Sequence, residues 1–143
     1  MEIRLMSIED YDKVYELWTN TKGMGMRSLD DSFEGIKRFL ERNPTTNYVA
    51  QDDDKLVGVI LCGHDGRRAY IYHTAVSPDY RRNGIGKALV NTVLEALKKE
   101  GINKAALVVF SSNELGNKFW QSVDFQKRED LFYRNISINE NNI

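Results

Sequence analysis

Apolar positions along the chain change their spacing several times, and each change marks the border of a predicted element. Steps of three and four residues predict amphipathic helices over residues 11–18, 33–40, 86–100 and 113–121. Short apolar stretches between turn residues predict strands over residues 2–6, 48–50, 56–61, 70–76 and 105–110, with closing strands at Phe125 and residues 131–138. The predicted order is β-α-α-β-β-β-α-β-α-β-β.

The connections between these elements indicate the kind of sheet. Asp52-Asp53-Asp54 and Asp65-Gly66 are turn sequences short enough for antiparallel hairpins. The helix over residues 86–100 is long enough to join two parallel strands. The sequence therefore predicts an α/β (α+β) fold with a mixed, mostly antiparallel central sheet flanked by about four helices. We expect residues 1–138 to form a single domain and the polar residues 139–143 to form a frayed tail.

Composition and charge narrow the classes of function. The chain has 143 residues, a formal net charge of -1, two histidines and one cysteine. This charge argues against a broad nucleic-acid surface, and so few thiols and imidazoles argue against a metal site. The amino-terminal residues show no secretory signal and no apolar stretch is long enough to cross a bilayer, so we expect a cytoplasmic protein with no membrane partner.

The junction between the strand ending at Val76 and the helix beginning near Gly86 is a candidate anion site. A helix start presents unpaired N–H groups and the positive end of the helix dipole. Gly84 and Gly86 allow a bulky phosphate to approach the backbone, and Arg81, Arg82 and Lys87 add positive charge. The alternative is an ordinary strand-to-helix turn that happens to carry surface arginines. The spacing matches neither a Walker A loop nor a dinucleotide-binding fingerprint.

Two stretches of sequence resemble one family. Ala75-Val76-Ser77-Pro78-Asp79-Tyr80-Arg81-Arg82-Asn83-Gly84-Ile85-Gly86-Lys87-Ala88-Leu89 resembles the acetyl-CoA motif of the GCN5-related N-acetyltransferases (GNAT). Residues 113–125 resemble its second cofactor motif, which has a tyrosine where this chain has Trp120. The resemblance implies an N-acetyltransferase domain whose sheet is splayed into a V that holds acetyl-CoA. The cofactor-binding residues that it implies are Ala75, Val76, Arg81, Arg82, Asn83, Gly84, Ile85, Gly86, Lys87, Asn113 and Trp120.

The same resemblance implies where the chemistry takes place. The backbone N–H of Val76 is the expected donor to the oxyanion of the reacting thioester. Some relatives carry a carboxylate base where this chain has the apolar Leu107-Val108-Val109. Others carry Glu or His on the strand face that here shows Tyr70 and Tyr72, so these two and Tyr133 are candidates for a proton relay. His73 has a side-chain pKa suited to a base and is an alternative candidate. Strict strand alternation, however, places Tyr70, Tyr72 and Thr74 on one face and Ile71, His73 and Ala75 on the other, so we expect His73 to point away from the cleft.

The acceptor is the least determined part of the prediction. We expect acetyl transfer to a primary amine of a small molecule, or to a peptide or protein N-terminus, by direct attack in a ternary complex. A catalytically weak CoA-binding sensor is the main alternative, and a nucleotide-phosphate binder of another family is a third. The chain is expected to be a monomer or a homodimer.

Overall fold

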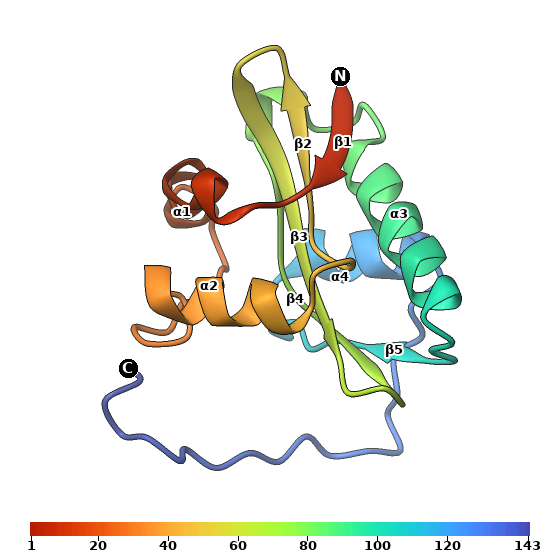
Figure 1. Ribbon diagram of the computed structural model, residues 1–143. Helices are drawn as coiled ribbons and strands as arrows, with labels where there is room; N and C mark the ends of the chain where they lie inside the picture. Colours follow the sequence, from red (N-terminus) through yellow and green to blue (C-terminus); the bar gives the residue numbers. More distant parts are fainter.

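A five-stranded sheet runs through the centre of the computed structural model, which describes residues 1–143 (Figure 1). Its strands are β1 (Glu2–Leu5), β2 (Tyr48–Asp52), β3 (Lys55–His64), β4 (Ala69–Val76) and β5 (Ala105–Ala106). The α-helices are α1 (Tyr11–Thr19), α2 (Phe33–Arg42), α3 (Ile85–Lys99) and α4 (Glu114–Ser122), and two short 3₁₀ helices are η1 (Ile8–Asp10) and η2 (Pro78–Tyr80). This mixed, mostly antiparallel sheet with four flanking helices confirms the predicted fold class.

The strands follow one another in chain order, and only the last pair is parallel. β4 and β5 are paired at just two positions, Ala69 with Ala105 and Tyr70 with Ala106. Beyond Tyr70 the two strands have no ladder in common, so the second edge of β4 is open along most of its length. This separation is the splayed V that the resemblance implied.

Two apolar clusters lie on opposite faces of the sheet, under different helices. Leu89, Val90 and Val93 of α3 pack with Ile71 and other buried residues of the sheet on one face. On the other face Val14 and Trp18 of α1 and Ile36 of α2 pack with Val59, Leu61 and Ala75. Figure 1 shows α3 on one side of the strands and α1 and α2 on the other. The helices therefore cover both faces, and the edge of β4 beyond Tyr70 has no paired strand.

A bulge in β4 overturns the expected alternation of its side chains. The register passes from Ile60 opposite Thr74 to Cys62 opposite Ile71, so Tyr72 and His73 together face the single residue Leu61. One extra residue on a strand reverses the faces of all residues after it. Ile71 accordingly belongs to the cluster under α3, whereas Ala75 belongs to the cluster under α1 and α2. The expectation that His73 points to the same face as Ile71 is wrong.

The predicted strands after α3 are shorter than expected or absent. β5 covers two residues instead of residues 105–110, because β4 diverges from it, and Val108 and Phe110 are exposed. Phe125 packs against Trp120 and lies in no strand. Residues 131–138 also form no strand: their backbone makes no hydrogen bond, and the side chain of Ile138 is 98% exposed. A strand needs a neighbouring edge to pair with, and this segment pairs with none.

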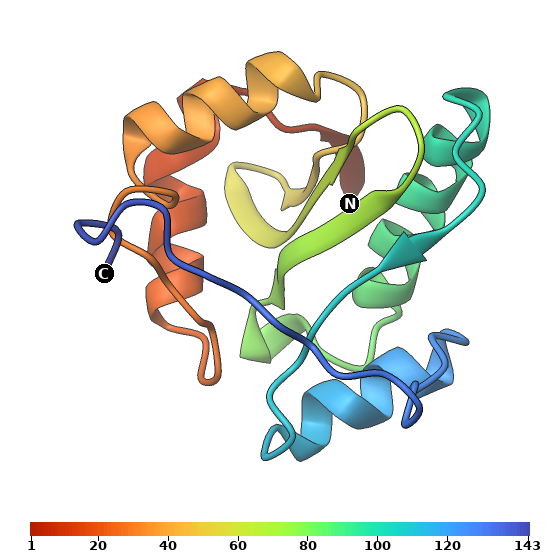
Figure 2. The same cartoon turned by 90° about the horizontal axis from the view of Figure 1, so that it is seen from below.

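The last residues cross the molecule to the loop between α1 and α2 (Figure 2). The backbone N–H of Ser28 donates to the carbonyl of Ile143 (2.8 Å), and the Asn142 side chain binds the backbone N–H groups of Leu29 and Asp30 (2.9 and 3.0 Å). Residues 139–143, expected to fray, thus have defined hydrogen-bond partners.

Candidate functional site

The loop before α3 presents a row of free backbone donors. η2 ends at Tyr80, and the N–H of Arg81 donates to Pro78. The next paired N–H is that of Ala88, which donates to the carbonyl of Gly84 (3.0 Å). The six N–H groups of residues 82–87 between them have no acceptor in the protein. Such a run of donors at a helix start is an anion-binding arrangement.

Two left-handed residues give the loop this shape. Arg82 has φ 67° and Gly84 has φ 77°, and a Cβ added at Gly84 would meet no atom within 4 Å. Left-handed residues in a short loop can turn neighbouring N–H groups toward one side, where they form an anion-binding concavity. Gly86 is needed for packing, because a Cβ there would lie 2.9 Å from the ring of Phe119 in α4. The loop is therefore open beside Gly84, where a phosphate would lie, and closed at Gly86.

Three cations surround the same loop. Arg81, Arg82 and Lys87 form no ion pair with any carboxylate. The Nε of Arg81 donates to the carbonyl of Val76 (3.2 Å), and Asn83 donates to the carbonyl of Tyr80 (3.3 Å). The free N–H groups, the open space at Gly84 and these unpaired charges fit a pyrophosphate.

Val76 presents its backbone to the open edge of β4. The N–H of the next residue, Ser77, donates to Val57 of β3 (2.8 Å). Backbone groups of successive strand residues point to opposite edges, so the N–H of Val76 points away from β3. The bond that its carbonyl accepts from Arg81 has the same direction. This N–H therefore faces the gap between β4 and β5, next to Ala75.

The two predicted cofactor residues around α4 have different surroundings. Asn113 caps the helix, since its Oδ1 accepts from the N–H of Gly116 (2.9 Å), while its Nδ2 makes no hydrogen bond. Trp120 packs between Phe119 and Phe125, with ring centroids 5.0 and 5.1 Å away. Asn113 thus keeps a free donor, and Trp120 serves in an aromatic cluster on the core.

The three tyrosines of the predicted relay gather at the start of β4. The rings of Tyr70 and Tyr72 lie 4.7 Å apart, and Tyr133 approaches from the carboxy-terminal segment. Burial, followed by the neighbouring Tyr133 and Tyr72, raises the pKa of Tyr70 to about 12. Burial also raises the pKa of Tyr72, with a further contribution from Asp30. Both hydroxyls keep their protons at neutral pH, so neither can act as a base.

An imidazole–carboxylate pair lies on the face covered by α1 and α2, and the sequence reasoning missed it. The Nε2 of His73 is 2.8 Å from Oδ1 of Asp31, whose Oδ2 accepts from the backbone N–H of Arg27 (2.7 Å). Because an ionised carboxylate can only accept, the neutral tautomer that fits this contact carries its proton on Nε2 and has its lone pair on Nδ1. The His73 side chain is 15% exposed and its ring stands against Trp18 at 4.9 Å. The arrangement is that of a base held by a carboxylate.

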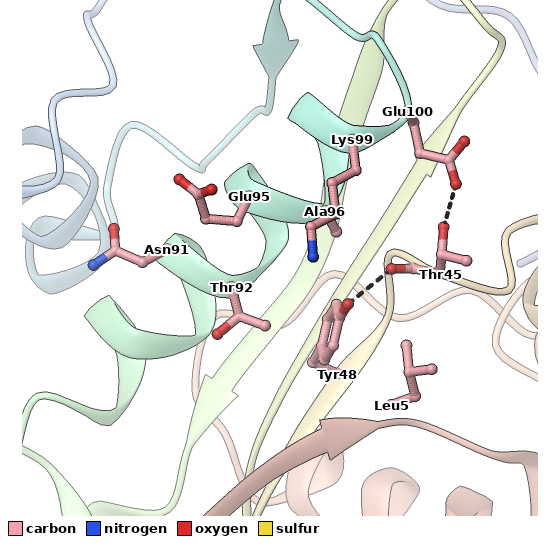
Figure 3. A pocket seen from close by; sticks show the side chains of 9 residues that line it. All are labelled: Leu5, Thr45, Tyr48, Asn91, Thr92, Glu95, Ala96, Lys99 and Glu100. Atoms are coloured by element: carbon pink, nitrogen blue, oxygen red, sulfur yellow. Dashed lines mark hydrogen bonds between the residues drawn. The ribbon is translucent and has the colours of Figure 1, made fainter.

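A separate pocket lies beside α3, away from these groups (Figure 3). It has a volume of about 580 Å³ between α3 and the start of β2. Thr45 donates to Glu100 (2.6 Å) and Tyr48 to the carbonyl of Thr45 (2.9 Å) along its wall. None of the predicted site residues lines it, so its size carries no functional meaning here.

Fold and site together fit a protein that binds a pyrophosphate-bearing cofactor beside an open strand edge. The chain belongs to the acetyltransferase (GNAT) family, whose model matches residues 11–125. An acetyltransferase of Sodalis glossinidius is 30% identical over 92% of this chain and 91% of its own length. One of Pectobacterium atrosepticum is 29% identical over 88% of each chain. The protein is an acyltransferase that uses acetyl-CoA.

Solved structures share the fold. A PaiA N-acetyltransferase from Thermoplasma acidophilum, in complex with coenzyme A, superimposes with a TM-score of 0.74 and is 25% identical, covering 85% of this chain and 86% of that one. The ribosomal-protein-S18-alanine N-acetyltransferase from Escherichia coli also gives 0.74, at 22% identity, covering 89% and 78% of the two chains. None of the helices of the present protein combines the length and apolarity needed to cross a bilayer.

Proposed function

We propose that the protein transfers the acetyl group of acetyl-CoA to a primary amine, of a small molecule or a peptide or protein N-terminus, by direct attack in a ternary complex. The observation that carries this proposal is the His73–Asp31 pair beside the open edge of β4. It supplies a proton acceptor on the face opposite α3, so the amine and the cofactor enter from different sides. Family membership alone supports acetyl transfer but names no acceptor.

The cofactor side of the site works through the backbone. The free N–H groups of residues 82–87 hold the pyrophosphate, with Arg81, Arg82 and Lys87 around it. Ala75 and Val76 line the pantetheine arm, and the Nδ2 of Asn113 is a further donor. The N–H of Val76 donates to the thioester oxygen as negative charge develops there. A preorganised donor of this kind contributes roughly 2.7–4 kcal/mol to transition-state stabilisation.

The acceptor side works through side chains. Nδ1 of His73 takes the proton that the amine must lose, and Asp31 fixes the ring and stabilises its charged form. His73 lies three residues before Val76, about 10 Å along a strand, so the proton passes through an intervening water. Tyr72, next to His73, supplies a hydroxyl that orders this water, while Tyr70 and Tyr133 lie farther toward the start of β4.

The departing thiolate receives little help from the protein. Trp120 stands where relatives have a tyrosine, and an indole N–H is no useful acid. A thiol pKa near about 8.5 makes a thiolate an acceptable leaving group without one. We therefore assign no side chain as general acid.

Release of free CoA thiol from acetyl-CoA, measured over a panel of amines and peptide N-termini, tests this function. The expected result is amine-dependent thiol release with one acetylated product for each CoA. Tight CoA binding without turnover for any acceptor would contradict it and favour the second candidate, a CoA-binding sensor. The sensor hypothesis is supported by the packing of Trp120 between two aromatic rings and by the lack of an assigned general acid for the thiolate.

A further inference from the structure

Tyr72 of β4 lines an open pocket of about 530 Å³. It lies between the end of α2, the hairpin joining β3 to β4, and β5, at the lower end of the sheet in Figure 1. Phe39, Tyr70 and Tyr72 form an aromatic wall, with Phe39 and Tyr72 edge to face at 5.5 Å. His73 is the next residue after Tyr72 and shares its face through the bulge. The pocket therefore ends at the residue that precedes the proposed base, on the same face of β4.

Three cations line this pocket without a partner. Arg42 comes from α2, Arg68 from the hairpin and Lys104 from the residue before β5. None of their side chains takes part in any ion pair, or in any hydrogen bond with another part of the protein. The one carboxylate in the lining, Asp65, instead accepts the backbone N–H groups of Arg67 and Arg68 (2.7 and 2.8 Å) in the hairpin turn. The pocket consequently has an excess of positive charge that nothing in the chain neutralises.

The opposite end of the same face is acidic. Asp31 holds His73, and Asp30 lies close enough to Tyr72 to add to the rise of its pKa that burial causes. A charged amine approaching His73 thus meets carboxylates, whereas the pocket beyond Tyr72 offers guanidinium and ammonium groups. Such an arrangement is complementary to a molecule with its amine at one end and a negative group at the other.

We propose that the acceptor is a primary amine that carries an anionic group, and that Arg42, Arg68 and Lys104 bind this group while the amine lies at His73. The proposal rests on the proposed function and narrows its acceptor class. Ala69 lines the pocket and lies four residues before His73 in β4. We therefore expect the amine and the anionic group of the acceptor to be separated by about 10–13 Å. A peptide of three or four residues with a free carboxylate spans that distance, since extended chains advance about 3.3–3.6 Å per residue.

The test compares acceptors that differ only in the distal group. Ala-Ala-Ala is offered as the free acid and as the carboxy-terminal amide, together with an Ala-Ala-phosphoserine amide that carries phosphate instead of carboxylate. The wild-type enzyme is expected to show a kcat/KM at least about 10-fold higher for the anionic peptides than for the neutral one, as charge-assisted hydrogen bonds predict. The ratio between the two anionic peptides identifies the preferred anion.

Variants locate the effect. In the double variant Arg42→Gln with Arg68→Gln, the kcat/KM for anionic peptides should come within about 3-fold of that for the neutral peptide. The kcat/KM for the neutral peptide should stay at its wild-type value, because only the anionic group loses partners. Arg67→Gln is the matched control, since Arg67 is an exposed neighbour in the same turn that does not line the pocket. Its preference should equal that of the wild type. Equal loss in Arg67→Gln would overturn the proposal by showing a long-range charge effect.

Calorimetric titration of the peptides into the CoA-bound protein gives a readout independent of turnover. Tighter binding of the anionic peptides that disappears in the double variant supports the proposal. Equal binding of acid and amide overturns it, even where amines are acetylated. Failure of all turnover while the charge-dependent binding persists would instead contradict the proposed function, so the two claims fail separately.

Discussion

The cofactor side and the acceptor side of the proposed site use different chemical groups. The cofactor side is made of backbone N–H groups on consecutive residues, held by Gly84 and Gly86. The acceptor side is made of side chains that come from α1, α2, their connecting loop and β4. A backbone site tolerates many side chains but depends on its shape, whereas a side-chain site can change its substrate by single substitutions. The two sides are therefore expected to respond differently to substitution.

The largest expected effect comes from Gly84→Glu. The new side chain places bulk and negative charge in the space beside the free N–H groups. We expect the Kd for CoA to rise about 100-fold or more, because hydrogen bonds to charged groups contribute roughly 1.5–3 kcal/mol each. Calorimetric titration with CoA measures it.

Gly101→Glu is the matched control for this change. Gly101 follows the other end of α3, has φ 78° against 77° at Gly84, and likewise has no atom within 4 Å of an added Cβ. Both variants should lose about 1–2 kcal/mol of stability from left-handed strain. Only Gly84→Glu should lose CoA. Equal losses of affinity would show that the loop acts through stability instead of contact.

Asp31→Asn tests the acceptor side at a residue that positions His73. The amide can donate to Nε2, which moves the ring proton to Nδ1 and removes the free lone pair. We expect kcat/KM to fall roughly 10- to 100-fold with CoA affinity unchanged, since the whole effect of a base is about 10²–10⁴-fold. In the wild type, the pH profile of kcat/KM should contain one limb whose position is the same for acceptors of different amine pKa, because it belongs to the enzyme's base. This limb should be absent in Asp31→Asn.

Asp10→Asn controls for the loss of a buried carboxylate. Asp10 is 8% exposed and Asp31 is 6% exposed. Asp10 lies directly before α1, and Asp31 lies in the loop between α1 and α2. The control should lose stability but keep the wild-type pH profile. A profile altered alike in both variants would count against a special role of Asp31.

The smallest expected effect concerns stability alone. Arg4 binds Asp10 through two hydrogen bonds (2.9 and 2.8 Å). Burial opposes ionisation of Asp10, but the bonds from Arg4 and from the Ser7 N–H outweigh it and lower its pKa. A lowered pKa stabilises the fold above the ordinary pKa of aspartate, and this contribution is lost as pH falls through the lowered value.

Arg4→Met should therefore reduce the free energy of unfolding by about 1 kcal/mol near neutral pH, a value moderated by solvent screening of the partly exposed arginine. Urea unfolding at several pH values measures the difference from wild type. The difference should shrink as the solution becomes acidic, while CoA affinity is unaffected. A difference that grows toward low pH would contradict the assignment of the ion pair.

The candidate phosphate loop can be located from the sequence, because its signal is local. Residues 81–86 are adjacent in the chain, and a strand, a glycine-rich turn and a helix start can be read from one short stretch. The fold class follows from the same local periodicities. The pairing of His73 with Asp31 is different, since the two are 42 residues apart. A single extra residue in β4 decides which face His73 occupies, and strict alternation gives the opposite face.

The carboxy-terminal segment shows a second limit of local patterns. Leu131, Tyr133, Ile136 and Ile138 have the apolar content of a strand, yet no neighbouring edge pairs with them. Pairing depends on how far β5 follows β4, and the sequence does not encode that in any one stretch. The docking of Asn142 on Asp30 is equally remote in sequence.

The central claim is that His73 accepts the proton of the amine while the backbone loop binds the cofactor. The most direct test measures turnover and CoA affinity together in His73→Gln. The account predicts a loss of turnover of about 100-fold or more and an unchanged Kd for CoA. Turnover in His73→Gln within about 3-fold of wild type would contradict it.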